Sequence, residues 1–129
     1  MEQRDYLMKQ VEMLGIVLGK LLAKLLGMKN TNDILETANQ TFTEEINLNI
    51  NDLCSINIEA LLKNEKINNA NLEKIADVLY FILTNSDTKE KTLLTKKCLE
   101  IYEYLDISEK TYSLERQQKI DKLQKEIEQ

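Results

Sequence analysis

The sequence predicts an all-α fold, an antiparallel helical bundle of five to six helices in one domain, residues 1–129. Three observations lead to this fold class. The chain contains no proline, and its only glycines are Gly15, Gly19 and Gly27. An all-β fold would need Gly and Pro at its turns, so this composition argues against one. Apolar residues instead recur at steps of three and four along most of the 129-residue chain, which is the period of a helix.

The first predicted element is an amphipathic helix within residues 1–28, from about residue 5. Its apolar residues share one broad arc: Leu7, Val11, Leu14, Leu18, Leu21, Leu22 and Leu25. Full burial of each such side chain stabilises a fold by about 1.5–3 kcal/mol, so we expect this arc to pack on the following helices. Along its border, small residues recur every four positions: Gly15, Gly19, Ala23 and Gly27. Because glycine within a helix costs about 0.5–1 kcal/mol relative to alanine, the row indicates close approach of a second backbone.

That second backbone belongs either to another helix of the same chain or to a second copy of the protein. The residues of this candidate seam are Val11, Gly15, Leu18, Gly19, Leu22, Ala23, Leu26 and Gly27. Lys20 and Lys24 interrupt the apolar residues, so we do not expect a membrane span, since a lysine at mid-bilayer costs about 2.5–3.5 kcal/mol. A helix lying on a membrane surface remains an alternative.

Residues 30–64 form the middle of the predicted bundle. A helix ends near residue 46, and its apolar stripe is Ile34, Leu35, Ala38, Phe42 and Ile46. Asp33 and Glu36 have the spacing of a capping box, although Thr31 or Asn32 could cap instead. The asparagine-rich residues 47–52 predict a connector, followed by a helical turn near Leu53 and a short helix capped by Asn57. They do not make a calcium loop, because the glycine and the glutamate of that motif are missing.

Residues 69–129 are expected to form tetratricopeptide-like helices and a C-terminal helix. The predicted helices run from 71 to 84, from 87 to 105, and from a Ser108 cap to about 128. The first two resemble one tetratricopeptide repeat, with Ile75, Ala76, Leu79, Leu94 and Cys98 at packing positions. The match is partial, because Lys91 stands where the repeat has a small residue. The last helix has a narrow apolar seam, typical of a bundle edge or a coiled-coil contact: Tyr112, Ile120, Leu123 and Ile127.

Two short stretches carry a resemblance to a known family. Residues 3–7, QRDYL, and residues 10–15, QVEMLG, resemble the start of a bacterial family catalogued only as a domain of unknown function. Tyr102, Tyr112, Glu115 and Arg116 are similar to its tetratricopeptide-like C-terminal half. The resemblance covers most of the chain, and its specific part is the first fifteen residues. It implies an all-helical, cytoplasmic bacterial protein and brings no known activity.

The composition argues against most chemistry. The chain has no histidine, which removes the usual general base and the commonest transition-metal ligand. It has no glycine-rich phosphate loop and no CxxC pair, so we expect no catalytic, cofactor-binding or metal site. Cys54 and Cys98 should be reduced, buried thiols. A net charge of −5 with only Arg4 and Arg116 as arginines argues against nucleic-acid binding.

The sequence therefore predicts a non-enzymatic protein-protein interaction or scaffold protein in the cytoplasm, whose protein partner is unknown. It is expected to self-associate through the first helix as a homodimer. The alternative is a peripheral membrane-surface adaptor that uses the same helix.

Overall fold

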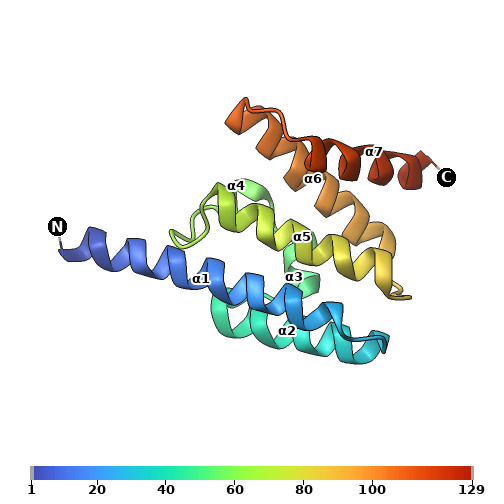
Figure 1. The fold of residues 1–129 in the computed structure, drawn as a ribbon, viewed down its shortest axis with the longest axis horizontal. Helices are drawn as coiled ribbons and strands as arrows, with labels where there is room; N and C mark the ends of the chain where they lie inside the picture. The colour runs from blue at the N-terminus through green and yellow to red at the C-terminus, as the bar shows by residue number, and fades with distance from the viewer. Residues whose placement is uncertain (1, 129) are drawn as a thin grey trace.

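The computed structural model describes residues 2–128, which form seven helices and no strand (Figure 1). The helices are α1 Glu2–Leu26, α2 Thr31–Ile46, α3 Ile50–Ser55, α4 Ile58–Leu61, α5 Asn69–Asn85, α6 Lys91–Glu109 and α7 Leu114–Glu128. The all-α prediction is confirmed, whereas the count of five to six was too low. The additional helix is α3, where only a helical turn was expected near Leu53, and the extended backbone of Ile56 (φ −81°, ψ 140°) separates it from α4.

The expected antiparallel arrangement holds for only some of the neighbouring helices. α1 and α5 run side by side in the same direction, since Asn71 bonds the carbonyl of Val11 and Lys74 bonds that of Gly15 (Figure 1). This parallel pairing arises because α2, α3 and α4 return the chain to its starting end before α5 begins. α5 and α6 are antiparallel, and α7 packs on α6.

One hydrophobic core draws buried side chains from every helix. α5 lies at its centre, between α1 and α6, and contributes the largest share. From α1 the core takes Leu14, Leu18, Leu21 and Leu25, each at most 4 % exposed. The predicted stripe of α2 is confirmed as well, with Ile34, Ala38, Phe42 and Ile46 buried. Burial of these arcs supplies the main favourable free energy of folding.

Asparagine residues start four of the helices. The side-chain oxygens of Asn30, Asn49, Asn57 and Asn68 each accept a bond from the backbone N–H three residues further on. Such a cap satisfies one of the N–H groups that the first turn leaves unpaired, and is worth about 0.5–2 kcal/mol. The predicted Asn57 cap is confirmed. The predicted caps of α2 were wrong, because Asn30 lies one turn before Asp33 and accepts the Asp33 N–H at 3.1 Å.

The boundary between α6 and α7 also differs from the prediction. Ser108 was expected to cap the last helix, but it lies within α6, which ends where Lys110 adopts a left-handed conformation (φ 56°). Ser113 precedes α7, and its hydroxyl oxygen accepts the Arg116 N–H at 3.3 Å. Ser108 instead accepts a bond from the Asn69 side chain at 3.1 Å. The sequence could not reveal this contact, because the two residues are 39 positions apart.

The apolar seam of the last helix is only partly buried. Ile120 and Leu123 lie in the core. Tyr112 lies in the loop before α7 and is 74 % exposed, and Ile127 near the end of α7 is 44 % exposed. The seam therefore attaches the middle of α7 to the bundle edge and leaves both ends of the segment in contact with solvent.

Candidate functional site

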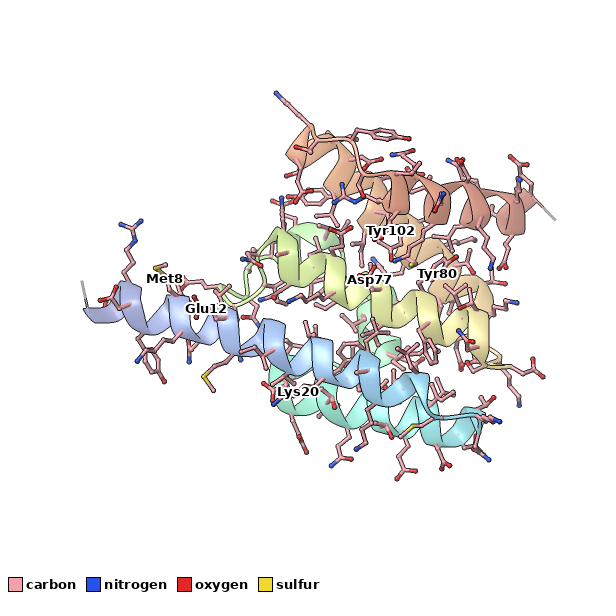
Figure 2. The ribbon with its side chains drawn as sticks, viewed as in Figure 1. Met8, Glu12, Lys20, Asp77, Tyr80 and Tyr102 are labelled. Atoms are coloured by element: carbon pink, nitrogen blue, oxygen red, sulfur yellow. The ribbon has the colours of Figure 1, made fainter. Side chains whose placement is uncertain are left out.

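α1 has one face in the core and an opposite face with no helix upon it. We call this second surface the outward face of α1; its residues are Glu12, Met13, Ile16, Gly19, Lys20 and Ala23, all exposed. They lie at steps of three and four, so they form one continuous strip. Met13 is 63 % and Ile16 is 57 % exposed. Figure 2 marks Glu12 and Lys20 along the helix. Met13 and Ile16 are three positions apart and so form an exposed apolar pair on this face.

The predicted seam does not lie on a single face. Four of its members point toward the core or toward α5, and these are the buried or half-buried Val11, Gly15, Leu18 and Leu22. The other four are exposed to solvent, and these are Gly19, Ala23, Leu26 and Gly27. The row of small residues drifts around the helix because four steps of 100° exceed one full turn by 40°. The sequence showed this drift, but not which neighbour each residue would meet.

Gly15 and Gly19 have opposite surroundings. A Cβ at Gly15 would lie 3.0 Å from Asn71 Oδ1 and 3.0 Å from Lys74 Nζ, both on α5. A Cβ at Gly19 would have no heavy atom within 4 Å. Gly15 thus provides room for two polar side chains of the same chain, which supports the intramolecular alternative at this position. Gly19 leaves its backbone open on the outward face.

The Asn71 side chain fixes α1 against α5. It is 2 % exposed, and its amide nitrogen donates to the carbonyl of Val11 at 2.9 Å and to that of Lys66 at 2.8 Å. Lys74 Nζ donates to the carbonyl of Gly15 at 3.2 Å. Because the amide is held by two bonds, its oxygen cannot move away easily from a new Cβ at Gly15.

Alanine substitutions at the two glycines should therefore change stability in opposite directions. Gly19→Ala should raise the free energy of unfolding by about 0.5–1 kcal/mol, because alanine is the better helix former. Gly15→Ala should lower it, because the clash with Asn71 outweighs the same gain in propensity. Urea denaturation of both variants at low protein concentration measures the difference. Equal stabilisation of both would show that α5 does not hold Asn71 against Gly15.

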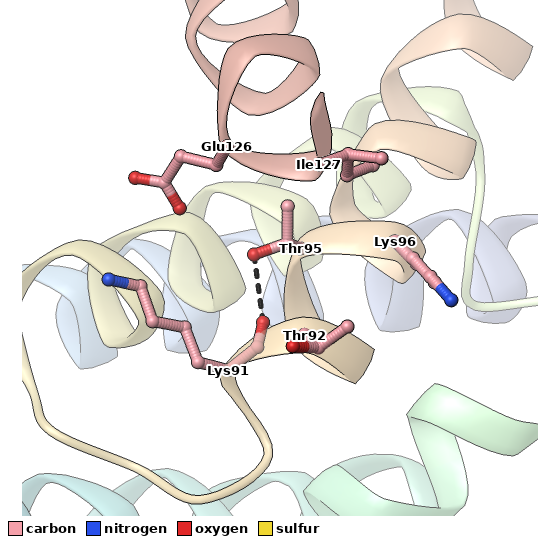
Figure 3. A pocket seen from close by; sticks show the side chains of 6 residues that line it. All are labelled: Lys91, Thr92, Thr95, Lys96, Glu126 and Ile127. Atoms are coloured by element: carbon pink, nitrogen blue, oxygen red, sulfur yellow. Dashed lines mark hydrogen bonds between the residues drawn. The ribbon is translucent and has the colours of Figure 1, made fainter. Parts of the chain in front are cut away.

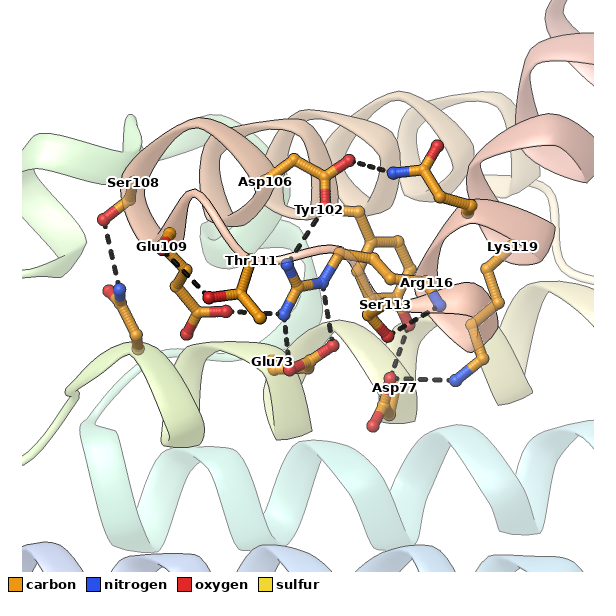
Figure 4. A network of polar contacts seen from close by, with 12 residues as sticks. Glu73, Asp77, Tyr102, Asp106, Ser108, Glu109, Thr111, Ser113, Arg116 and Lys119 are labelled. Atoms are coloured by element: carbon orange, nitrogen blue, oxygen red, sulfur yellow. Dashed lines mark hydrogen bonds and ion pairs between the residues drawn. The ribbon is translucent and has the colours of Figure 1, made fainter.

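A polar network joins the other side of the bundle (Figure 4). Arg116 of α7 is 4 % exposed and lies among three carboxylates from two other helices. It bonds both oxygens of Glu73, from Nε at 3.0 Å and from Nη2 at 2.9 Å. It also reaches Asp106 at 3.0 Å and Glu109 at 2.8 Å. These bonds raise the pKa of Arg116, with Glu73 the main cause, so the guanidinium remains charged at every pH the fold meets.

A second part of the network surrounds Asp77 of α5. Its Oδ1 accepts the Tyr102 hydroxyl at 2.6 Å and the Lys119 ammonium at 3.1 Å. The same ammonium lies 5.4 Å from the Tyr80 ring centre and 5.7 Å from that of Tyr102. Burial raises the pKa of Tyr102, assisted by the nearby Cys98 and Asp77, so its hydroxyl stays protonated and donates.

The network attaches α7 to α5 and α6, and sequence analysis missed it. Glu73 and Asp77 are one turn apart on α5 and face the same neighbour. Their partners come from residues 102–119, at sequence separations of 25 to 43. The one available signal was Arg116 itself, one of two arginines in the chain, placed beside the narrow apolar seam of the last helix. Each of its carboxylates, Glu73, Asp77, Asp106 and Glu109, is paired with Arg116 or Lys119, as is typical of a structural contact.

A surface hollow lies between the start of α6 and the end of α7 (Figure 3). It measures about 540 Å³ and is lined by Lys91, Thr92, Thr95, Lys96, Glu126 and Ile127. The Thr95 hydroxyl donates to the carbonyl of Lys91 at 2.8 Å, as is usual for a threonine within a helix. Within residues 2–128, no group of three or more His, Cys, Asp or Glu side chains is arranged so that it could hold a metal ion.

Both cysteines are free thiols, as predicted, but only Cys98 is buried as expected, because Cys54 is half-buried. Cys98 is fully buried among the residues of α5 and α6, and its Sγ donates to the carbonyl of Ala76 at 3.3 Å. Desolvation by burial raises the pKa of Cys98, and to a lesser degree that of the half-buried Cys54. The thiolate is the nucleophilic form, so both thiols should be poorly reactive in the folded state.

We expect native protein at neutral pH to react slowly with one equivalent of a disulfide reagent, at Cys54. Cys98 should react only after urea unfolds the chain, because reagent cannot reach it in the core. Absorbance of the released thiol, followed with and without urea, measures this. The Cys54→Ser variant should remove the native reaction and leave the urea-dependent one. Rapid native reaction of two thiols per chain would contradict the burial of Cys98.

The comparisons with known proteins give no relative. The sequence matches no protein-family model, and neither a curated protein nor a solved structure matches the chain. The resemblance of the first fifteen residues to a bacterial family therefore stays a prediction. Among residues 2–128, no helix has the length and apolar character needed to cross a membrane.

Proposed function

We propose that this protein is a non-enzymatic helical interaction or scaffold protein that self-associates through the outward face of α1. The observation that carries this proposal is the exposure of Met13 and Ile16 on a helix whose opposite face buries Leu14, Leu18, Leu21 and Leu25 in the core. The core of the chain holds α1 rigidly by four leucines, so the outward face is presented without a large ordering cost on binding. This makes the face a preformed surface for another helix.

Gly19 supports the same proposal. Apart from the neighbouring residues of α1 itself, no atom lies within 4 Å of a Cβ built there, so a second helix can approach the α1 backbone closely. A glycine at an exposed helix position lowers stability relative to alanine. The intramolecular alternative, which accounts for Gly15, does not account for Gly19. A second copy of the chain would supply the contact that makes this glycine useful.

Sedimentation velocity over a range of protein concentrations tests this function. The wild type should shift from monomer toward dimer as concentration rises. Gly19→Leu should stay helical and remain a monomer, because its side chain separates the two backbones. Thr92→Leu places the same side chain at an exposed position of α6 and should dimerise like the wild type. A wild type that stays monomeric at high micromolar concentration would overturn self-association.

A membrane-surface adaptor is the second candidate. Tyr6, Met8 and Leu26 of α1 are also exposed, at 65 %, 55 % and 66 %, and lysines lie between them. Interfacial helices combine such apolar residues with a basic polar face. Glu12 at one end of the outward face disfavours an anionic lipid surface. Flotation with vesicles that contain phosphatidylserine separates the candidates, because only the adaptor would float.

The α5–α6 pair is consistent with a role as a scaffold. We infer that it represents a single tetratricopeptide-like unit, since the helices are antiparallel and Cys98 packs directly on Ala76. Under this proposal the pair supports α1 and α7 rather than forming an array of repeats. The proposed setting is the bacterial cytoplasm, as the resemblance of the first fifteen residues implies.

A further inference from the structure

The charges on the outward face of α1 suggest how two copies would meet. Glu12, Ile16 and Lys20 follow one another at steps of four residues, and all three are exposed. At 100° per residue, Glu12 and Lys20 lie about 40° to either side of Ile16. At a rise of 1.5 Å per residue, they lie about 6 Å along the axis before and after it. The strip is therefore apolar at its centre, acidic at one end and basic at the other.

We propose that a second copy packs on this face with its α1 antiparallel, and that the two-fold axis passes beside Ile16. This inference rests on the proposed self-association and adds its orientation. The antiparallel arrangement brings Glu12 of one copy level with Lys20 of the other, and the symmetry makes this contact twice. A parallel pair would instead bring Glu12 level with Glu12 and Lys20 level with Lys20. The antiparallel dimer is favoured, because its opposite charges attract each other, whereas the like charges of a parallel dimer would repel each other at a similar distance.

Gly19 provides the space that this contact needs. In the antiparallel pair, Glu12 of one copy lies over Gly19 of the other, where the chain leaves room for a side chain. Its carboxylate can therefore turn toward the adjacent Lys20. Ile16 packs against Ile16 at the centre, which removes a large exposed apolar side chain of each copy from water.

One charge opposes the arrangement. Lys9 is exposed, and it would lie on the same side of the contact as Lys20 of the second copy. Its ammonium must then extend into solvent, and the dimer should be weak. The repulsion between Lys9 and Lys20 of the second copy can be used to test the orientation. Reversing the charge of Lys9 should lower the dissociation constant of an antiparallel dimer. In a parallel dimer Lys9 would face Lys9, and Lys9→Glu would only replace one like pair with another.

Charge-reversal variants analysed by sedimentation velocity at low salt test the orientation. Glu12→Lys and Lys20→Glu should each raise the dimer dissociation constant about tenfold, since each converts two attractive pairs into repulsive ones. The double variant with both changes should dimerise at least as tightly as the wild type. Lys9→Glu should lower the dissociation constant. Glu36→Lys and Lys96→Glu, with the same charge changes at exposed positions of α2 and α6, should leave it unchanged.

The outcomes separate this inference from the proposed function. A wild type that remains monomeric overturns both, and binding of that monomer to phosphatidylserine vesicles would assign the face to a membrane. A dimer that is lost in Gly19→Leu but unaffected by the single charge reversals keeps self-association and overturns the antiparallel orientation. If the double variant dimerises more weakly than either single variant, self-association is kept and the antiparallel orientation is again overturned. Circular dichroism of each variant shows whether a lost dimer reflects a lost fold.

Discussion

Replacing Arg116 with methionine should lower the free energy of unfolding by about 3–5 kcal/mol, the cost typical of removing one partner from a buried charge cluster. The methionine fills a similar volume but leaves Glu73, Asp106 and Glu109 facing one another without a cation. These carboxylates come from α5 and α6, and each bonds the guanidinium within 3.0 Å. Their mutual repulsion would separate α7 from the bundle or force the carboxylates toward solvent.

Urea denaturation followed by far-UV circular dichroism measures the effect. Arg116→Lys is the matched control, because it keeps one positive charge but cannot bond both oxygens of Glu73 together with the other two carboxylates. It should lose less stability than Arg116→Met. If Arg116→Met is as stable as the wild type at neutral pH, the network does not hold α7.

Leu18→Ala should lower the free energy of unfolding by about 2–5 kcal/mol, whereas Ile16→Ala should change it by less than about 0.5 kcal/mol. Leu18 is 1 % exposed in the core, and Ile16, two positions away on the same helix, is 57 % exposed. Truncating Leu18 leaves a cavity between α1 and its neighbours. Truncating Ile16 removes only atoms that already contact water in the monomer.

The pair also separates folding from association. At concentrations low enough to keep the chain monomeric, denaturation should show a large loss for Leu18→Ala alone. At high concentration, sedimentation should show weaker dimers for Ile16→Ala, because it removes the centre of the proposed contact. If both substitutions lowered the stability of the monomer by similar amounts, the burial of Leu18 and the exposure of Ile16 would both be contradicted.

The sequence by itself determined the helices and their buried faces. Regular spacing of apolar residues, such as Ile34, Ala38 and Phe42, places them on one side of a helix whatever its neighbours are. The absence of proline argued against an all-β fold, and the absence of histidine argued against most catalytic chemistry. Both follow from the composition alone. The predicted helix ends were wrong where Asn30 and Ser113 act as caps. Several consecutive polar residues can each cap a helix, and only the path of the backbone decides which of them does.

The tertiary structure decided which residues of α1 meet a neighbour within the chain and which remain exposed. Gly15 and Gly19 are equivalent in sequence, yet Asn71 and Lys74 occupy the space beside the first and nothing occupies the space beside the second. The cluster around Arg116 also depends on the fold, because its carboxylates lie up to 43 residues away along the chain. Periodicity describes a helix relative to its own axis. The partners on each face depend on the path of the whole chain, and in this protein α2, α3 and α4 set that path by returning the chain so that α5 lies parallel to α1.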